Sequence, residues 1–318
     1  MHINYIVIAH ERPFQLRRLI NRLASSNVHF YVHIDKKVDI RPFVETLDNI
    51  NSVHMINDAD REVCRWGGVG IVMATLACMR YMIRDQRNGR CVLLSVQDYP
   101  IVSNHKIKGF FESNKTKDFI DSCPFPISDW IDGGYYRLNQ YHYQLGNKKY
   151  STRSLPSIWD PAFYAKLMNH LVLLLKLLAR GKIPYQIFSR RDHSIVKAPC
   201  GGHGWWALNV STIKAIISFL DQNPNFLSFF KHVHVPDEII FQSILKQIVT
   251  ESEVHPTVTY TNWLAGGSSP KVFAEQDLDE LKTVSGEFLF ARKFSEEDDS
   301  KILDLLDKYL LVCEDVDT

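Results

Sequence analysis

Two short clusters of charged residues have the side-chain types needed to transfer a group onto a hydroxyl. Glu238 follows Pro236 and Asp237, and Arg292 is followed directly by Lys293. A carboxylate can take the proton of an attacking hydroxyl, and cations can stabilise a leaving diphosphate. Alone, the first cluster is more often a helix start, where the macrodipole favours a carboxylate, and the second is by default solvated. Neighbours on a strand point to opposite faces, so only a loop aims both cations at one diphosphate.

The elements that must position these residues begin with alternating strand and helix patterns. Buried-strand patterns at 5–9, 29–34 and 91–95 are separated by apolar residues at helical spacing over 14–23 and 70–83. This alternation predicts an α/β fold with a mostly parallel sheet and right-handed crossovers.

Polar residues directly follow each of these strand patterns. They include His10 after Ala9, Asp35 after the second pattern, and Asp98 after the third. Ligands of open parallel sheets lie beyond the carboxyl ends of the strands, so the sequence places a polar rim where a ligand is expected. Asp98 could instead cap the helix expected to begin near Ser103.

The rest of the chain is less regular, with aromatic residues gathered between 122 and 157. We expect a helix rich in Leu and Lys over about 161–180, helices from 211 and over 236–249, a strand near Val258, and a closing helix over 298–311. Trp205 and Trp206 belong to a strand pattern, so one of them is expected to face the core. No repeat or linker is visible, which predicts a single domain over 1–318.

Composition excludes several classes of protein. The 318 residues carry a formal net charge of +1, which argues against a dedicated nucleic-acid binder. The six cysteines show no C-x-x-C pair or zinc spacing, and suit buried free thiols. A strand pattern follows Met1 with no signal peptide before it, and the apolar run 171–178 is short for a membrane span. We therefore expect a cytoplasmic protein.

One segment leaves a peripheral membrane contact open. Residues 167–178, with Lys166, Lys176, Arg180 and Lys182 around them, could lie on the inner face of an anionic bilayer. A core helix with a solvated edge is the favoured interpretation.

Five segments together resemble the core-2/I-branching β-1,6-N-acetylglucosaminyltransferase family, which also contains peptide O-xylosyltransferases. The resemblance runs from about residue 3 to residue 294. The segments are YIVIAH at 5–10 with VHIDKK at 32–37, WGG at 66–68, LSVQDYP at 94–100, GGHGWWAL at 201–208 with PDE at 236–238, and FARKF at 290–294.

The resemblance implies a GT-A-type fold whose residues 1–120 bind the nucleotide sugar and whose residues 121–318 bind the acceptor and carry the catalytic base. It implies a UDP-sugar donor, with N-acetylglucosamine or xylose as the sugar, inversion at the anomeric carbon, no divalent metal and no other cofactor. The acceptor would be an oligosaccharide or a lipid-linked glycan. The resemblance implies Glu238 as base, Arg292 and Lys293 for the diphosphate, Asp35, Trp66 and Gly67 for the nucleotide, and Trp263 for the acceptor. From their positions in the sequence we add Lys271 for the diphosphate, Ala9 and His10 for the nucleotide, and Asp98, Trp205 and Arg137 for the acceptor.

Two alternatives to this function remain at this point. Asp58-Ala59-Asp60 has the D-x-D pattern with which many GT-A enzymes bind manganese, but the expected donor-site strand ends instead in Ser95-Val96-Gln97-Asp98. A metal-dependent transferase using Asp58 and Asp60 is thus the less favoured mechanism. A non-catalytic carbohydrate-binding protein on the same fold is the other alternative, although such a protein could lose Glu238 and the basic pair.

Overall fold

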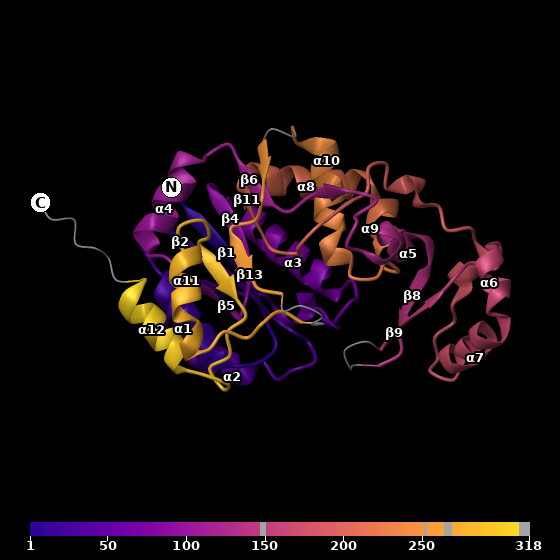
Figure 1. Ribbon diagram of the computed structural model, residues 1–318, viewed down its shortest axis with the longest axis horizontal. Helices are drawn as coiled ribbons and strands as arrows, with labels where there is room; N and C mark the ends of the chain where they lie inside the picture. The colour runs from indigo at the N-terminus through magenta and orange to yellow at the C-terminus, as the bar shows by residue number, and fades with distance from the viewer. Residues whose placement is uncertain (147–150, 251–252, 264–268, 312–318) are drawn as a thin grey trace, which may run out of the picture.

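The computed structural model describes residues 1–146, 151–250, 253–263 and 269–311. Its centre is a seven-stranded sheet (Figure 1) in which four of the six neighbouring pairs are parallel and β11 is antiparallel to both of its neighbours. The α/β class and the mostly parallel sheet are therefore confirmed. In spatial order the strands are β12 (Val254–His255), β6 (Asp118–Ile120), β11 (Trp206–Asn209), β4 (Arg90–Ser95), β1 (Ile3–Ala9), β2 (Val28–Ile34) and β3 (Val53–Met55).

Strand β1 is buried on both faces, because its alternate side chains enter two different cores. Tyr5 and Val7 pack into one apolar cluster, and Ile6 and Ile8 into the other. The first cluster is covered by α1 (Pro13–Leu23), α2 (Arg41–Leu47), α4 (Asn104–Ser113), α11 (Leu278–Val284) and α12 (Lys301–Tyr309). The second is covered by α3 (Gly70–Arg84), α8 (Val210–Gln222), α9 (Pro224–Phe230) and α10 (Ile240–Ile248).

A second, three-stranded sheet joins the end of the chain to the first hundred residues. Strand β14 (Phe290–Arg292) lies between β13 (Thr259–Thr261), to which it is parallel, and β5 (Asp98–Pro100), to which it is antiparallel. In this register Arg292 is opposite Asp98.

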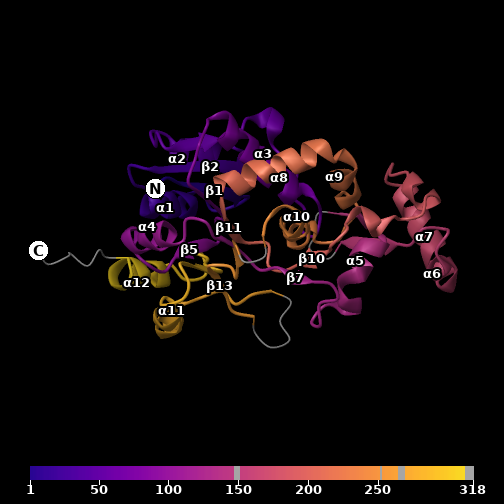
Figure 2. The same cartoon turned by 90° about the horizontal axis from the view of Figure 1, so that it is seen from above.

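The described residues from α5 (Tyr135–Asn139) through α7 (Leu167–Leu178) to residue 190 form a lobe at the end of the molecule away from α12 in both views (Figures 1 and 2). It also contains the hairpin of β8 (Tyr141–Gln144) and β9 (Thr152–Leu155), and α6 (Pro161–Ala165). Six side chains give it a small core of its own: Tyr141, Tyr143, Leu155, Phe163, Leu177 and Ile187.

The prediction for 161–180 was wrong in two respects. The helix is broken at Lys166, whose backbone (φ −130°, ψ 38°) leaves the α region between α6 and α7. Nor is α7 a core helix, because Leu177 is its one fully buried side chain. Elsewhere the expected strands and helices of the first hundred residues are present, while α2 and β3 were missed because both are short.

Two findings bear on the expected environment of the chain. Within the described ranges, no helix is long and apolar enough to cross a membrane. Cys64, Cys78, Cys91, Cys123 and Cys200 are free thiols, of which Cys123 is exposed, and Cys313 lies outside the described residues.

Candidate active site

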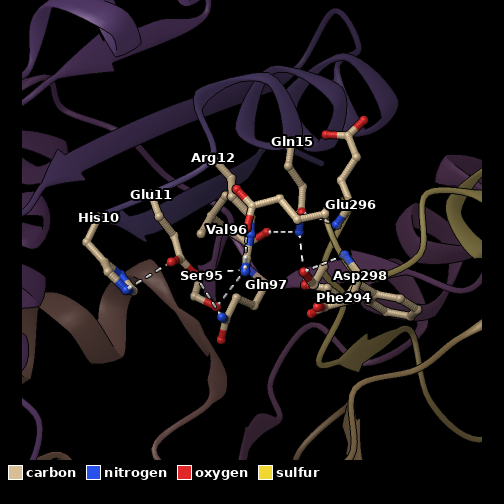
Figure 3. Close-up of polar contacts among 12 residues, drawn as sticks. His10, Glu11, Arg12, Gln15, Ser95, Val96, Gln97, Phe294, Glu296 and Asp298 are labelled. Atoms are coloured by element: carbon tan, nitrogen blue, oxygen red, sulfur yellow. Dashed lines mark hydrogen bonds and ion pairs between the residues drawn. The ribbon is translucent and has the colours of Figure 1, made fainter. Parts of the chain in front are cut away.

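The loops after β1 and β4 and the segment after β14 are held together by buried polar contacts (Figure 3). Gln15 of α1 donates to the carbonyl of Val96 at 2.7 Å and to that of Phe294 at 3.1 Å, and its own carbonyl accepts from the backbone N–H of Glu296 at 2.8 Å. These bonds fix the chain directly after the basic pair relative to α1 and the loop after β4. The sequence carried a signal for Gln15 that was missed: it lies on the stripe of α1 formed by buried apolar residues.

Arg292 is held by a buried ion pair. Its Nε lies 3.0 Å from Oδ1 of Asp98, which is fully buried, and its guanidinium stacks over Trp205 with Cζ 4.0 Å from the ring centroid. The other carboxylate oxygen of Asp98 accepts from the backbone N–H of Ser95 at 2.6 Å and from the Ser95 hydroxyl. Burial raises the pKa of Asp98, and the Arg292 charge opposes that shift. Buried Asp98 and partly exposed Trp205 thus both contact Arg292. Ser103, not Asp98, caps α4.

The two lysines predicted for the diphosphate differ in their surroundings. Lys293 is half-buried. Its backbone N–H donates to the carbonyl of Lys271, and its carbonyl accepts from the N–H of Phe273. Lys271 lies 2.7 Å from Asp277 and 2.8 Å from Glu280, and bonding to Asp277 is the main cause of its raised pKa. Two carboxylates therefore balance the charge of Lys271.

Glu238 lies on a 3₁₀ turn, η5 (Pro236–Glu238), that is separate from the following helix. The helix predicted over 236–249 was wrong at its start: Ile239 (φ −133°, ψ −40°) interrupts it, and α10 begins at Ile240. Glu238 therefore lies before α10 and not within its first turn. Its Oε2 instead accepts from Arg137 at 2.7 Å, and the side chain is 28% exposed.

Arg137 is positioned to contact Glu238 more than to meet an acceptor. Its guanidinium stacks on Trp130, with Cζ 3.6 Å from the ring centroid, and its side chain is largely buried. The sequence placed Arg137 in the cleft, but its contact with the proposed base could not be foreseen from spacing.

Asp237, next to the proposed base, has unusual electrostatics. Desolvation raises the pKa of Asp237 to about 7, and the negative charge of Glu238 is the second cause. The positive charges of Arg137 and Arg292 act in the opposite direction. Negative and positive groups from η5, α5 and β14 therefore meet in one region.

His203 connects this region to Trp263. Its Nδ1 lies 2.7 Å from Oδ2 of Asp121, and its Nε2 lies 3.2 Å from the indole N–H of Trp263, with the two rings nearly parallel. The bond to Asp121 is the main cause of the raised pKa of His203, to which the charge of Glu238 also contributes. Trp263 is half exposed, as an acceptor-stacking ring would need to be. Sequence reasoning missed Asp121, a carboxylate directly after β6.

The glycine-rich segment 201–204 is shaped by close contacts with protein atoms. A Cβ at Gly202 would lie 2.2 Å from the Asp121 carbonyl oxygen, and one at Gly201 would lie 2.6 Å from the Trp130 ring. The N–H of Gly202 also donates to the Glu238 carbonyl at 3.0 Å. These glycines let the loop pack against η5 and hold Glu238 in place.

The residues predicted to bind the nucleotide lie at the ends of β1 and β2. The Ala9 carbonyl accepts from the N–H of Asp35 at 2.8 Å, which joins the two strand ends, and the His10 side chain is exposed. The Asp35 carboxylate accepts from the N–H of Lys37 at 2.9 Å and lies 3.1 Å from its Nζ. Buried Arg61 binds the carbonyls of Ile34 and Asp35 and so fixes this loop.

The Trp66–Gly67 turn connects the nucleotide side to the proposed base. The Gly67 carbonyl accepts from the N–H of Val235 at 3.0 Å, directly before η5, and Trp66 contacts the ring of His234 edge-on. Gly67 has φ +74°, and a Cβ there would lie 3.0 Å from the His234 ring, so glycine suits both the backbone and the space.

Asp58 and Asp60, the D-x-D pair, lie away from the end of β4. They form the 3₁₀ turn η1 (Asp58–Asp60) after β3, where Asp58 pairs with Arg61 at 2.6 Å and Asp60 accepts from the Tyr81 hydroxyl at 2.6 Å. Both carboxylates therefore have protein partners. Among the described residues, no group of three or more His, Cys, Asp or Glu side chains could hold a metal ion.

A groove of about 370 Å³ runs from the Trp66–Gly67 turn to the lobe. Gly67, Gly68 and His232 line it together with Lys182 and Ile183. The lobe therefore borders the loops that carry the nucleotide-side residues.

Comparison with known proteins gives one family match. A family model described as "Core-2/I-Branching enzyme" matches residues 3–170, slightly more than half of the chain. That span contains β1, β2, β4 and the Trp66–Gly67 turn, but not Glu238 or Arg292.

Several curated proteins are similar to nearly the whole chain, including the part that the family model does not match. Xylosyltransferase 2 of Homo sapiens is 24% identical over 336 residues, which is 98% of this chain and 34% of the relative. Xylosyltransferase 2 of Mus musculus is 23% identical over the same shares, and xylosyltransferase 1 of Rattus norvegicus is 21% identical over 98% of this chain and 35% of the relative. This chain thus spans about a third of the length of these relatives.

Proposed function

The chain belongs to the core-2/I-branching enzyme family, a family of glycosyltransferases, and on that premise we propose that it moves a sugar from a UDP-sugar to a hydroxyl of a glycan. The transfer inverts the anomeric carbon and needs no divalent metal ion. N-acetylglucosamine and xylose are the two sugars we propose, and an oligosaccharide or lipid-linked glycan is the acceptor.

The observation that carries this proposal is the meeting of Glu238 and Arg292 in one region. Glu238 is partly exposed and held by Arg137 through Oε2, so we assign proton abstraction to Oε1. An inverting transfer needs one such base on the far side of the sugar. Arg137 orients this base, a role that differs from the acceptor contact suggested by the sequence.

The leaving diphosphate requires positive charge that does not have to rearrange as the bond breaks. Arg292 is held in place by Asp98 and Trp205 before any donor binds, and Lys293 follows it directly. We propose that these two cations bind the diphosphate. Lys271, already balanced by Asp277 and Glu280, instead supports the loop that carries Lys293.

Metal independence is supported by the partners of the D-x-D pair. Arg61 and Tyr81 bind Asp58 and Asp60 on the turn after β3, whereas Arg292 is opposite Asp98, just after β4. Ala9, His10, Asp35 and the Trp66–Gly67 turn are the proposed nucleotide side of the site, and exposed Trp263 the proposed acceptor platform.

The test is Glu238→Gln, which keeps the size of the side chain but removes the base. General-base catalysis is worth about 10² to 10⁴ in rate, so we expect transfer to fall at least a hundredfold while the melting temperature and UDP affinity stay close to those of the parent. Glu287→Gln, at an exposed position on the far loop before β14, is the matched control. A fully active Glu238→Gln enzyme would rule out this mechanism.

Calorimetric titration of the protein with UDP tests metal independence. UDP should bind in the presence of EDTA with an affinity that added manganese or magnesium leaves unchanged. Binding that depends on either ion would contradict this part of the proposal.

A further inference from the structure

The lobe carries most of the large apolar side chains that the described chain exposes. Eleven of the eighteen such side chains fall between Trp159 and Phe188. Six of them are on α7, where Leu175 is 66% exposed and Met168 72% exposed. Monomeric proteins rarely leave so much apolar surface in one place unless it meets a partner.

The exposed residues of α7 share one face. At 100° per residue they occupy an arc of about 140°, next to the small core of the lobe, which contains Leu177. Lys176 follows on the adjoining polar face, and Arg180 lies in the turn directly after the helix. The six residues of this arc, here called the α7 apolar face, are Leu167, Met168, Leu171, Val172, Leu175 and Leu178.

The charge of the same segment is strongly positive. Residues 153–197 contain eight Lys and Arg and two Asp and Glu, a net charge of +6 in a chain whose formal net charge is +1. Lys166, Lys176, Arg180, Lys182 and Arg190 are all exposed there. An apolar helix face flanked by cations is complementary to a surface that is apolar inside and anionic at its border.

Aromatic side chains at the edge of the lobe fit the same kind of surface. Trp159, Tyr164 and Tyr185 are exposed, and amphipathic rings of this type favour the boundary between hydrocarbon and water. A folded protein partner would not account for the excess of cations. If two copies of this chain met lobe to lobe, two segments that each carry a net charge of +6 would face and repel each other.

We propose that the lobe is a membrane-binding surface that seats the α7 apolar face in an anionic lipid bilayer. The groove that joins Lys182 and Ile183 to Gly67 then lies next to the bilayer. This inference rests on the lobe alone and does not require the proposed transfer activity.

The experiment is flotation of the full chain with vesicles of phosphatidylcholine, with and without phosphatidylglycerol. We expect binding to the anionic vesicles at low salt, and weaker binding at high salt because the Debye length shrinks from about 8 Å at 0.15 M to about 3 Å at 1 M. Melting curves of each variant report folding independently of binding.

Two lobe variants and two matched controls separate the contributions. Leu175→Asp should reduce partition at least tenfold, because it places a charge in the centre of the α7 apolar face. The double variant Lys176→Glu and Arg180→Glu should reduce it at least 25-fold, at about fivefold for each lost cation. Phe14→Asp, at a 74% exposed position on α1, and Lys214→Glu, on α8, should leave partition unchanged.

Three results would overturn the proposal. The first is no binding to anionic vesicles, and the second is equal binding to neutral and anionic vesicles. The third is equal loss in the controls and the lobe variants. A dimer seen by light scattering that Leu175→Asp dissociates, without vesicle binding, would assign the α7 apolar face to a second copy of the chain.

Discussion

Asp98 and Arg292 form a buried ion pair whose energy can be measured. The carboxylate is fully buried, and the Arg292 side chain keeps 11% of its exposure. Removing one partner of a buried pair leaves the other charge without compensation, which costs about 3–5 kcal/mol. For Asp98→Asn we expect the lower end, about 3 kcal/mol, because the Trp205 ring still faces the guanidinium at 4.0 Å.

The change on the other side of the pair, Arg292→Met, should lower the free energy of unfolding by a similar amount. The effects of the two changes should not be additive. Arg292→Met leaves the Asp98 carboxyl buried without a cation, whereas the double variant leaves no unpaired charge. Replacing both members of a buried pair by neutral groups is often close to neutral. We therefore expect the double variant to be more stable than the sum of the single effects predicts, by about 2 kcal/mol or more.

Urea unfolding of the four proteins without UDP gives the coupling free energy directly. The exposed pair Asp39 and Arg41, with side chains 48% and 81% exposed, is the matched control and should show no resolvable coupling. Additivity of Asp98→Asn and Arg292→Met within about 0.5 kcal/mol would refute the assignment of Asp98 as the support of Arg292.

Two further predictions concern the neighbouring charges. Because the folded-state pKa of Asp237 is raised to about 7 from 3.8, the stability that its protonated form contributes is lost as pH rises from about 4 to about 7. In urea unfolding, the free energy of unfolding of Asp237→Asn minus that of the parent should thus rise by about 2 kcal/mol from pH 5 to pH 8. A difference that does not change with pH would contradict the raised pKa of Asp237. Lys293→Ala should lower turnover roughly a hundredfold, because one cation at the leaving diphosphate is lost. Lys115→Ala is its control, and near-normal turnover would mean that Lys293 is ordinary surface.

The fold of the first hundred residues could be predicted because its strands and helices follow regular periods. Strand β1 is apolar throughout, as expected for a parallel strand covered on both faces, and α1 has its apolar residues on one stripe. The same reasoning failed at α7, where an apolar sequence did not mean burial. Composition describes how apolar a helix is, but not whether anything covers it.

Motifs indicated which residues to consider for the site, but not which residues contact one another. Arg292, Glu238 and Trp263 were identified from short segments, yet the roles of Asp98 and Arg137 depended on pairs between distant elements. The start of the helix after Glu238 was misplaced because Pro236 fits the first position of either a 3₁₀ turn or an α-helix. The functional roles of these site residues stay predictions until the variants are measured.

The bonds of Gln15 have a consequence for how the molecule is made. Gln15 donates to Phe294, 279 positions further along the chain, and β14 enters its sheet between strands formed much earlier. Contacts of such long range slow folding, because the intervening chain must be ordered before they form. As the chain leaves the ribosome, Arg292 and α12 are synthesised after every strand of the seven-stranded sheet. Asp98 therefore lacks its cation, and the first core lacks the helix that closes it, until synthesis is nearly complete, so this buried ion pair is formed among the last steps of folding.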